Sequence, residues 1–390
     1  MRTRIAPGAW LGLLGGGQLG RMFCMAAQSL GYKVAVLDPG GDSPAGSVAD
    51  RHIQADYLDP RGLAELAALC RAATTEFENV PAAALDFLAR DARVTPAAES
   101  VAIAQDRIRE KTFLASHGFG VAPFAVLESA EAARRVDPAL IPGIVKSARF
   151  GYDGKGQIRV ASVAEVTAAF GAMQGAACVL EQFVSLACEV SVIVARNERG
   201  ESATWPVAEN RHRDGILDVS IVPARVAPEI AMRARDLACA VATALDYRGV
   251  LCVEMFVTVD GTLLVNEIAP RPHNSGHYTI DACVTSQFEQ QARVLADLPL
   301  GDPVQHTPAV MVNLLGDIWF ADPAAATPRE PDWNAVLAHP RAKLHLYGKA
   351  EPRRGRKMGH ITCLGDRLDD ALATARAVKI ALGIPGADAL

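Results

Sequence analysis

Two glutamates in a predicted β-hairpin are the residues whose type and spacing point most clearly to chemistry. Residues 251–278 read LCVEMFVTVDGTLLVNEIAPRPHNSGHY, with β-rich apolar runs on both sides of Asp260-Gly261, a dipeptide typical of hairpin turns. A two-residue turn there pairs Val259 with Thr262, and counting back places Glu254 directly opposite Glu267. Opposed carboxylates about 5 Å apart repel each other unless a cation lies between them, and oxygen ligands suit Mg²⁺. We therefore predict a Mg²⁺ site; the alternatives are two exposed glutamates or a bulge that breaks the register.

A glycine-rich segment after a short apolar strand is the second candidate site. Ile144-Val145-Lys146 ends the strand, and residues 149–157 read RFGYDGKGQ. Three glycines in six residues do not suit a strand interior, whereas a loop of this composition can fold its N–H groups and Lys155 over phosphates. The Walker A pattern, GxxxxGKS or GxxxxGKT, is absent from the sequence. We predict a phosphate-clamping loop with Lys146 directed at it; a plain hairpin turn and a solvent-exposed lysine are the alternatives.

A glycine turn near the start of the chain is the third candidate. Residues 15–20 read GGGQLG between a short strand and a helical pattern, and Asp38 follows 18 residues after Gly20. This spacing matches a dinucleotide-binding fingerprint, although its physical content is narrower: a tight turn directs N–H groups and a helix N-terminus at an anion. A simple strand–helix turn is the alternative. Glu76 and Glu78 end the last clear strand of this region, where they are either ligand contacts or solvated loop acids.

The elements around these sites suggest four parts. Alternating strands and helices predict a parallel α/β domain over residues 1–105, and one helix is predicted over 100–117 with Arg107, Arg109 and Lys111 on a solvated face. A small lobe with the glycine-rich loop spans 106–190 and a large lobe with the hairpin spans 191–305. A mostly β C-terminal subdomain, 306–390, carries a basic run, Arg353 to Lys357. Between the lobes, residues 178–184 (CVLEQFV) form an apolar strand that can offer backbone groups to a purine edge.

Composition narrows the class of protein. The chain has 390 residues, a net charge of −5 and a pI near 6.0, which argue against nucleic-acid binding. No uninterrupted apolar run approaches the ~20 residues of a membrane span, and no signal peptide is evident. The eight cysteines show neither CxxC nor zinc spacing, so we expect reduced thiols in a cytoplasmic protein.

The order of these features resembles the ATP-grasp superfamily. Within it, four segments are similar to the 5-(carboxyamino)imidazole ribonucleotide synthase family of purine biosynthesis: GGGQLGRM at 15–22, GYDGKGQ at 151–157, NEIAPRPHNSGHYT at 266–279 and GRKMGH at 355–360. The resemblance covers nearly the whole chain, and the third segment is highly specific. It implies a mixed α/β and α+β fold with two β-rich grasp lobes. It also implies ATP-dependent carboxylation of 5-aminoimidazole ribonucleotide by bicarbonate through carboxyphosphate, with Mg²⁺ as cofactor, by a homodimer.

The resemblance also assigns roles to residues of this sequence. Mg²⁺ would be held by Glu254 and Glu267, and the reacting groups would meet Lys146, Tyr152, Asp153, Arg271 and His273. The ribonucleotide would contact Glu76, Tyr152, Asp153, Arg271, His273, Asn274, Lys349 and Arg356. ATP would contact Arg107, Lys146, Gly151, Tyr152, Asp153, Gly154, Lys155, Gly156, Gln157, Glu181, Gln182, Phe183, Val184, Glu189, His212, Asn266 and Glu267. Many grasp enzymes have an asparagine two residues after the second metal glutamate, where this chain has Ala269, which leaves the number of Mg²⁺ ions open.

Three other classes remain to be compared with the structure. An NAD-dependent oxidoreductase would use the glycine turn and Asp38 but would leave the hairpin glutamates and the 151–157 loop without a role. A grasp ligase that uses formate or an amino acid would share most of the motifs. A nucleotide sensor without catalytic activity would not need the metal carboxylates or Lys146.

Overall fold

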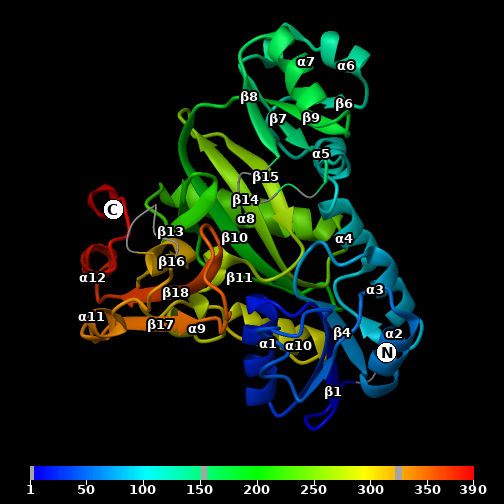
Figure 1. The fold of residues 1–390 in the computed structure, drawn as a ribbon, viewed down its shortest axis with the longest axis vertical. Coiled ribbons are helices and arrows are strands. Elements are labelled where there is room, and N and C mark those ends of the chain that lie inside the picture. Colours follow the sequence, from blue (N-terminus) through cyan, green and yellow to red (C-terminus); the bar gives the residue numbers. More distant parts are fainter. Residues whose placement is uncertain (1–3, 150, 152–155, 321–326) are drawn as a thin grey trace.

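The part of the chain that the structure describes forms three sheets, and the first is a parallel sheet near the N-terminus (Figure 1). The computed structural model describes residues 4–149, 151, 156–320 and 327–390. All neighbouring strands of the first sheet are parallel, in the order β3-β2-β1-β4-β5. Its elements are β1 (Trp10–Leu14), α1 (Gln18–Ser29), β2 (Lys33–Leu37), β3 (Arg51–Ile53), α2 (Pro60–Leu69), β4 (Ala72–Thr75), α3 (Ala82–Leu88) and β5 (Arg93–Val94). The parallel α/β prediction is confirmed.

The helix predicted over residues 100–117 is in fact two helices. The first, α4 (Ala98–Ala104), ends at Gln105, and α5 (Arg107–Ser116) begins after Asp106, whose side chain accepts hydrogen bonds from the N–H groups of Ile108 and Arg109. An aspartate at this position is a strong N-cap, so a new helix starts in a new direction. Because α5 packs against β9 and β15 of the two lobes, the prediction of a solvated face is wrong for two of its three cations, Arg107 and Lys111.

The small lobe contains the second sheet, which is antiparallel. Its order is β6-β9-β7-β8, and Figure 1 shows it at the end of the molecule farthest from β1 and β17. Val145, Leu180 and Phe170 are among the residues of its own apolar core. The elements are β6 (Phe124–Leu127), α6 (Ala130–Arg134), η1 (Pro138–Leu140), β7 (Gly143–Ser147), β8 (Gln157–Val160), α7 (Val163–Ala172) and β9 (Cys178–Gln182).

The large lobe and the C-terminal residues share the third sheet of nine strands. Its order is β15-β14-β10-β12-β13-β16-β18-β17, with β11 paired to β10. The C-terminal strands therefore continue the sheet of the large lobe, because β16 pairs with β13 on one side and β18 on the other. The strands are β10 (Leu186–Arg196), β11 (Ser202–Thr204), β12 (Ala208–Arg213), β13 (Ile216–Val222), β14 (Gly249–Thr258), β15 (Leu263–Ala269), β16 (Ala309–Leu315), β17 (Ala342–Leu346) and β18 (Lys357–Leu364).

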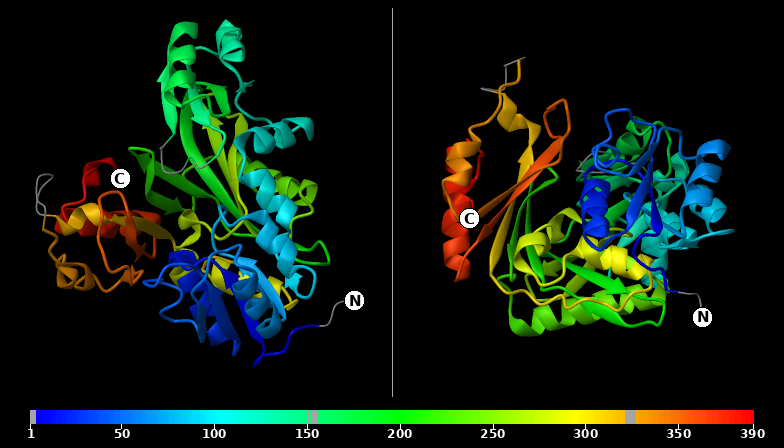
Figure 2. Two further views of the ribbon diagram at one scale, coloured as in Figure 1. Left: turned by 45° about the vertical axis from the view of Figure 1, so that its right-hand side comes forward. Right: turned by 90° about the horizontal axis from the view of Figure 1, so that it is seen from below.

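Helices cover this sheet and join it to the N-terminal domain (Figure 2). One core cluster unites Phe23 of α1 with Phe288 of α10 and with Tyr347 after β17, so three segments far apart in sequence pack together. None of the helices in the described part of the chain is long and apolar enough to cross a membrane. The remaining helical elements are α8 (Pro228–Ala244), η2 (Asn274–Gly276), α9 (Thr279–Ala282), α10 (Gln287–Leu295), η3 (Gly316–Trp319), α11 (Trp333–Leu337), α12 (Leu368–Ala381) and η4 (Ala387–Ala389).

Candidate active site

The predicted hairpin exists, and Glu254 of β14 lies directly opposite Glu267 of β15. The hairpin differs from the predicted one in two features, whose effects on the register offset each other at this pair. The turn is one residue longer, because Thr258 rather than Val259 pairs with Thr262 through a 2.9 Å backbone bond. A bulge between Met255 and Glu254 then restores the predicted register. The extra residue of the bulge is Asn266, so the bulge adds a third polar side chain to the pair of glutamates.

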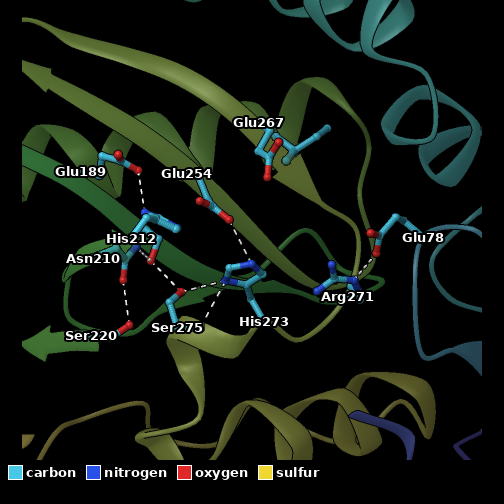
Figure 3. Close-up of polar contacts among 12 residues, drawn as sticks. Glu78, Glu189, Asn210, His212, Ser220, Glu254, Glu267, Arg271, His273 and Ser275 are labelled. Carbon is cyan, nitrogen blue, oxygen red and sulfur yellow. Dashed lines mark hydrogen bonds and ion pairs between the residues drawn. The ribbon is translucent and has the colours of Figure 1, made fainter. Parts of the chain in front are cut away.

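Each glutamate of this pair has a basic partner, and Figure 3 shows the partner of Glu254. Glu254 Oε1 lies 2.9 Å from His273 Nε2, and Glu267 Oε2 lies 3.2 Å from Arg107 Nη2. Burial alone would raise the pKa of Glu254, but its interaction with His273 lowers that pKa to about 2. Glu254 is thus kept ionised, which is the state in which a carboxylate binds a cation.

The oxygen atoms near the hairpin suit a hard cation. Asn266 Oδ1 is buried and makes no hydrogen bond to any described residue, and Asn266 lines the same cavity as both glutamates. Two carboxylates and an amide oxygen are a typical donor set for Mg²⁺. When bound, Mg²⁺ would neutralise phosphate charge, and Glu254, Glu267 and Asn266 would hold it.

A cavity of about 850 Å³ lies between the small sheet and the hairpin. Most of the predicted nucleotide and metal residues line it: Arg107, Lys146, Gly151, Gln157, Glu181, Gln182, Phe183, Val184, Glu189, His212, Glu254, Asn266 and Glu267, together with Arg271, His273 and Asn274. Gly156 has a left-handed φ of 70° but does not line the cavity. The predictions for Tyr152, Asp153, Gly154 and Lys155 lie outside the described residues.

Three cations, of which the two lysines are buried, surround one buried carboxylate at the wall of this cavity. Glu181 receives Lys146 at 3.0 Å, Lys111 at 3.3 Å and Arg107 at 3.9 Å. Burial alone would raise the pKa of Glu181, but these three cations lower it. Burial lowers the pKa of Lys146, and the charges of Arg107 and Lys111 lower it further, whereas the charge of Glu181 acts in the opposite direction. The positive charges outnumber Glu181, which suits a site for a polyanion.

Sequence reasoning missed Lys111, whose side chain is fully buried. A signal was present: Arg107 and Lys111 are four residues apart, so they lie on the same face of α5. Glu110 is also buried, and its Oε1 accepts a hydrogen bond of 2.6 Å from the Ile268 N–H, next to Glu267. Burial raises the pKa of Glu110 to about 8, although the charge of Arg107 acts in the opposite direction.

Glu189 and His212 form another pair at the cavity. His212 Nδ1 lies 2.9 Å from Glu189 Oε2. Burial alone would lower the pKa of His212, but the hydrogen bond and charge of Glu189 raise it. Both residues lie on neighbouring strands, β10 and β12, on the same sheet as the hairpin.

A second cavity of about 370 Å³ lies beside the glycine turn. Asp38 accepts a hydrogen bond of 2.8 Å from the Gly16 N–H, and Glu76 accepts from the N–H groups of Gly17 and Leu19. A side chain at position 17 would place its Cβ 2.2 Å from Glu76 Oε1, so the glycine is required by this close approach. The anions at the turn are therefore the chain's own carboxylates, which argues against a dinucleotide phosphate there.

Arg271 connects this second cavity to the first. Its guanidinium makes a short ion pair with Glu78 (Figure 3). Burial alone would raise the pKa of Glu78, but Arg271 lowers it to about 2. Five residues line both cavities: Glu78, Arg271, His273, Asn274 and Lys357. The two cavities thus meet at a wall with two cations and a histidine.

The predicted ribonucleotide residues are only partly brought together. Glu76, Arg271, His273 and Asn274 line the second cavity, whereas Lys349 and Arg356 line neither cavity. Lys349 Nζ instead donates to the Lys357 carbonyl at 2.7 Å, and Arg356 donates to the Glu351 carbonyl at 2.7 Å. Lys357 belongs to the basic run noted in the sequence. The start of β18 directs Lys357, rather than Arg356, to the cavities.

Three family models match successive parts of the chain. They are a ribonucleotide synthetase preATP-grasp domain at residues 9–105, an ATP-grasp domain at residues 112–288 and a phosphoribosylaminoimidazole carboxylase C-terminal domain at residues 309–374. Together with the cavity between the lobes and the opposed pair of glutamates, these matches define an ATP-grasp enzyme.

Similar proteins narrow this class. The N5-carboxyaminoimidazole ribonucleotide synthase of Brucella melitensis is 48% identical over 369 residues, 94% of this chain and 99% of that protein. The protein of the same name from Bacillus subtilis is 46% identical over 367 residues, which are 94% of this chain and 94% of that protein. A crystal structure of the Aspergillus clavatus synthase with ADP and 5-aminoimidazole ribonucleotide has a TM-score of 0.87 at 30% identity, covering 96% of this chain and 99% of that one. The chain belongs to the N5-carboxyaminoimidazole ribonucleotide synthase family.

Proposed function

We propose that this chain uses ATP and bicarbonate to carboxylate the exocyclic amine of 5-aminoimidazole ribonucleotide, in purine biosynthesis. ATP would phosphorylate bicarbonate, giving ADP and carboxyphosphate. The carboxyl carbon would then be attacked by the amine, which loses a proton as phosphate leaves. The products are N5-carboxyaminoimidazole ribonucleotide, ADP and phosphate.

The observation that carries this proposal is the wall shared by the two cavities. A reaction that makes an acyl phosphate in one place and uses it in another needs the two substrates to meet. Arg271, His273 and Lys357 line both cavities. Positive and hydrogen-bonding groups there can hold the carboxyphosphate between nucleotide and acceptor. Positioning and charge neutralisation are the main contributions of a protein to phosphoryl transfer.

The first cavity supports nucleotide binding. The cations Arg107 and Lys146 would face the phosphates, with Gly151–Gln157 as the covering loop. At the connection between the lobes, the Gln182 and Phe183 N–H groups donate to Pro123 and Pro142 carbonyls. Among backbone bonds between described residues, none uses the Val184 N–H. That group is the donor we assign to the adenine edge.

The hairpin supports Mg²⁺ binding, with a direct test. Glu267→Gln keeps the shape of the side chain but removes one of two opposed negative charges. We expect ADP formation to fall below one hundredth of the wild-type rate, with an unchanged melting temperature because the Glu267 side chain is 40% exposed. Glu131→Gln, in an exposed ion pair, is the control. Wild-type turnover of the Glu267 variant at saturating Mg²⁺ would refute the metal assignment.

The second cavity supports binding of the ribonucleotide. We propose that Glu76, Arg271, His273 and Asn274 contact it, with Tyr152 and Asp153 from the glycine-rich loop. We add Lys357, which lines the cavity, and we assign Lys349 to supporting Lys357 through its carbonyl. We also propose Arg356, the neighbour of Lys357 in the basic run, as a contact of the 5′-phosphate.

The reaction itself is tested by measuring ADP release with and without bicarbonate for each candidate acceptor. We expect release to require both bicarbonate and 5-aminoimidazole ribonucleotide. ADP release that requires formate or an amino acid in place of bicarbonate would show a different grasp ligase. ATP binding without any turnover would instead favour the nucleotide sensor.

We also propose the four-part division at 105, 190 and 305, of which the positions of the three family models support the first and the last boundary. A cytoplasmic location is supported by the eight cysteines, all of which are free thiols. The homodimer expected from the family is tested by sedimentation equilibrium, which should give about twice the 41.3 kDa of one chain.

A further inference from the structure

A chain of hydrogen bonds runs through the interior of the large sheet to His273 (Figure 3). Ser220 Oγ donates to Asn210 Oδ1 at 2.8 Å, and Asn210 Nδ2 donates to Ser191 Oγ at 2.8 Å. The Ser191 and Ser275 hydroxyls are 2.7 Å apart, and Ser275 Oγ is 2.9 Å from His273 Nδ1. Ser191, Asn210, Ser220 and Ser275 are each at most 5% exposed. Since water has little access, these groups depend on one another for partners.

The direction of donation along this series of hydrogen bonds depends on the groups at its two ends. At one end, the Ser275 backbone N–H donates to His273 Nδ1 at 3.3 Å. A backbone N–H cannot accept, so Nδ1 must offer a lone pair. At the other end, the Asn210 Nδ2 donates to Ser191 Oγ, and donation onward from Ser191 to Ser275 and from Ser275 to Nδ1 is consistent with that role of Nδ1. The Ser275 N–H therefore places the ring proton on Nε2, which lies 2.9 Å from Glu254 Oε1.

The sheet brings these residues to one face. Ser191 is directly opposite Glu254 across β10 and β14, and Asn210 is directly opposite Ser220 across β12 and β13. Opposed residues of antiparallel strands share a face. The His273 backbone is held as well, because Gln287 accepts from its N–H at 2.9 Å and donates to its carbonyl at 2.7 Å. The ring is thus fixed in place before its tautomer is chosen.

We propose that Ser191 and Ser275, supplied by Asn210, are positioning residues that hold the neutral His273 ring in its Nε2–H tautomer. This tautomer presents a hydrogen-bond donor to Glu254 at the wall shared by the two cavities. The other tautomer would present a lone pair to a carboxylate, which repels it. The catalytic consequence rests on the proposed function, whereas the tautomer itself does not.

The tautomer is measured directly by ¹⁵N NMR of the full chain labelled on histidine, without substrates. The sequence has nine histidines, so the His273 signals are assigned by their loss in His273→Gln. We expect an unprotonated Nδ1 and a protonated Nε2 at a pH where the ring is neutral. A proton on Nδ1 in the wild-type chain would overturn the proposal, whatever the enzyme's activity.

Two matched variants separate positioning from packing. Ser191→Ala and Ser220→Ala each remove one buried hydroxyl, and each leaves one atom of the same Asn210 amide without its partner. Only Ser191→Ala interrupts the chain between Asn210 and His273. We expect Ser191→Ala to shift the His273 Nδ1 resonance, because the Ser275 hydroxyl loses the partner that directs it to Nδ1, and to lower kcat about tenfold, the lower end for loss of an orienting partner, with the ATP KM unchanged. Ser220→Ala should keep the wild-type spectrum and kcat. Equal effects of the two variants on the spectrum and on kcat would overturn the positioning role.

Discussion

At the scale of single residues, the nucleotide cavity is defined by how its buried charges are shared. Lys146 lines the cavity, whereas Lys111 does not, yet both lysines lie within 3.3 Å of the same Glu181 oxygen. A lysine that moves to a phosphate would leave Glu181 with one fewer partner. Lys111 can remain on Glu181 and keep that buried carboxylate neutralised.

This sharing predicts a binding defect for Lys111→Met. Without Lys111, movement of Lys146 to a phosphate would leave Glu181 without a lysine, at a cost of about 1.5–3 kcal/mol. We expect the ATP KM to rise roughly 10- to 150-fold, measured by steady-state kinetics at saturating bicarbonate and acceptor. Lys343→Met, an exposed lysine on β17, is the control and should change little. An unchanged ATP KM for Lys111→Met would show that Lys146 does not need this support.

The buried Glu110 predicts an unusual dependence of stability on pH. Its pKa is raised from 4.5 to about 8, so between these values the unfolded chain releases a proton that the folded chain keeps. Stability from this group is therefore full below pH 4.5 and is lost as pH rises to about 8. Glu78 and Glu254, whose pKa values are lowered to about 2, act in a different window: their contribution is present above pH 4.5 and is lost as pH falls towards 2.

Glu110→Gln separates these windows, since the amide oxygen can still accept from the Ile268 N–H. We expect a melting temperature close to wild type at pH 5 and higher than wild type at pH 9. The difference in unfolding free energy at pH 9 is at most ~5 kcal/mol from the pKa difference. Thermal melts across this range provide the measurement, with exposed Glu131→Gln as control. A difference that is the same at both pH values would contradict the raised pKa.

At the scale of elements, the metal hairpin combines a three-residue turn with a bulge at Asn266. The turn residue Gly261 has a φ of 81°, as a three-residue turn with a left-handed last residue requires. The bulge keeps Glu254 opposite Glu267 and also places the unpaired Asn266 Oδ1 beside the glutamates. Turn and bulge are therefore separable: the turn closes the hairpin and the bulge supplies Asn266, the proposed third Mg²⁺ ligand.

Two single-residue deletions test this separation. Deleting Val259, which is 76% exposed, leaves a two-residue Asp-Gly turn that still pairs Thr258 with Thr262. We expect this variant to keep most ADP formation. Deleting Asn266 removes the bulge while keeping Glu254 opposite Glu267, and we expect at least a tenfold loss of Mg²⁺ affinity. Both are read from ADP release against Mg²⁺ concentration. Equal losses for the two deletions would mean that the hairpin, rather than Asn266, sets Mg²⁺ affinity.

At the scale of the whole molecule, the small lobe is the part with the most independence. Its sheet and its apolar core are its own, whereas the N-terminal domain, α10 and Tyr347 share one core. The large lobe and C-terminal strands share one sheet. Local opening should therefore be easiest in the small lobe, and a ligand between the lobes should suppress it.

Hydrogen exchange tests this arrangement. A non-hydrolysable ATP analogue with Mg²⁺ should slow amide exchange in β7, β8 and β9, because the ligand contacts both lobes. The C-terminal α12 lies outside both cavities and serves as internal control, with unchanged exchange. Protection spread equally over α12 and the small lobe would indicate general stabilisation rather than clamping.

The sequence by itself determined the elements that depend on neighbouring residues. The parallel N-terminal domain and the order of the lobes followed from apolar periodicity and turn residues, and the family followed from four motifs. The opposition of Glu254 and Glu267 was also predicted correctly, although a longer turn and a bulge produced it. Local steric preferences act over a few residues, so a linear pattern reports them.

Only the tertiary structure decided which distant groups meet. The Asp106 cap turned α5 into the molecule and buried Lys111, which a solvated helix face did not predict. Arg271 found Glu78, 193 residues away, and β18 directed Lys357 rather than Arg356 to the cavities. The hydrogen bonds from Ser220 to His273 need three strands and the segment after β15 to be in register. Such contacts depend on burial and long-range pairing, which the spacing of residues along one chain does not encode.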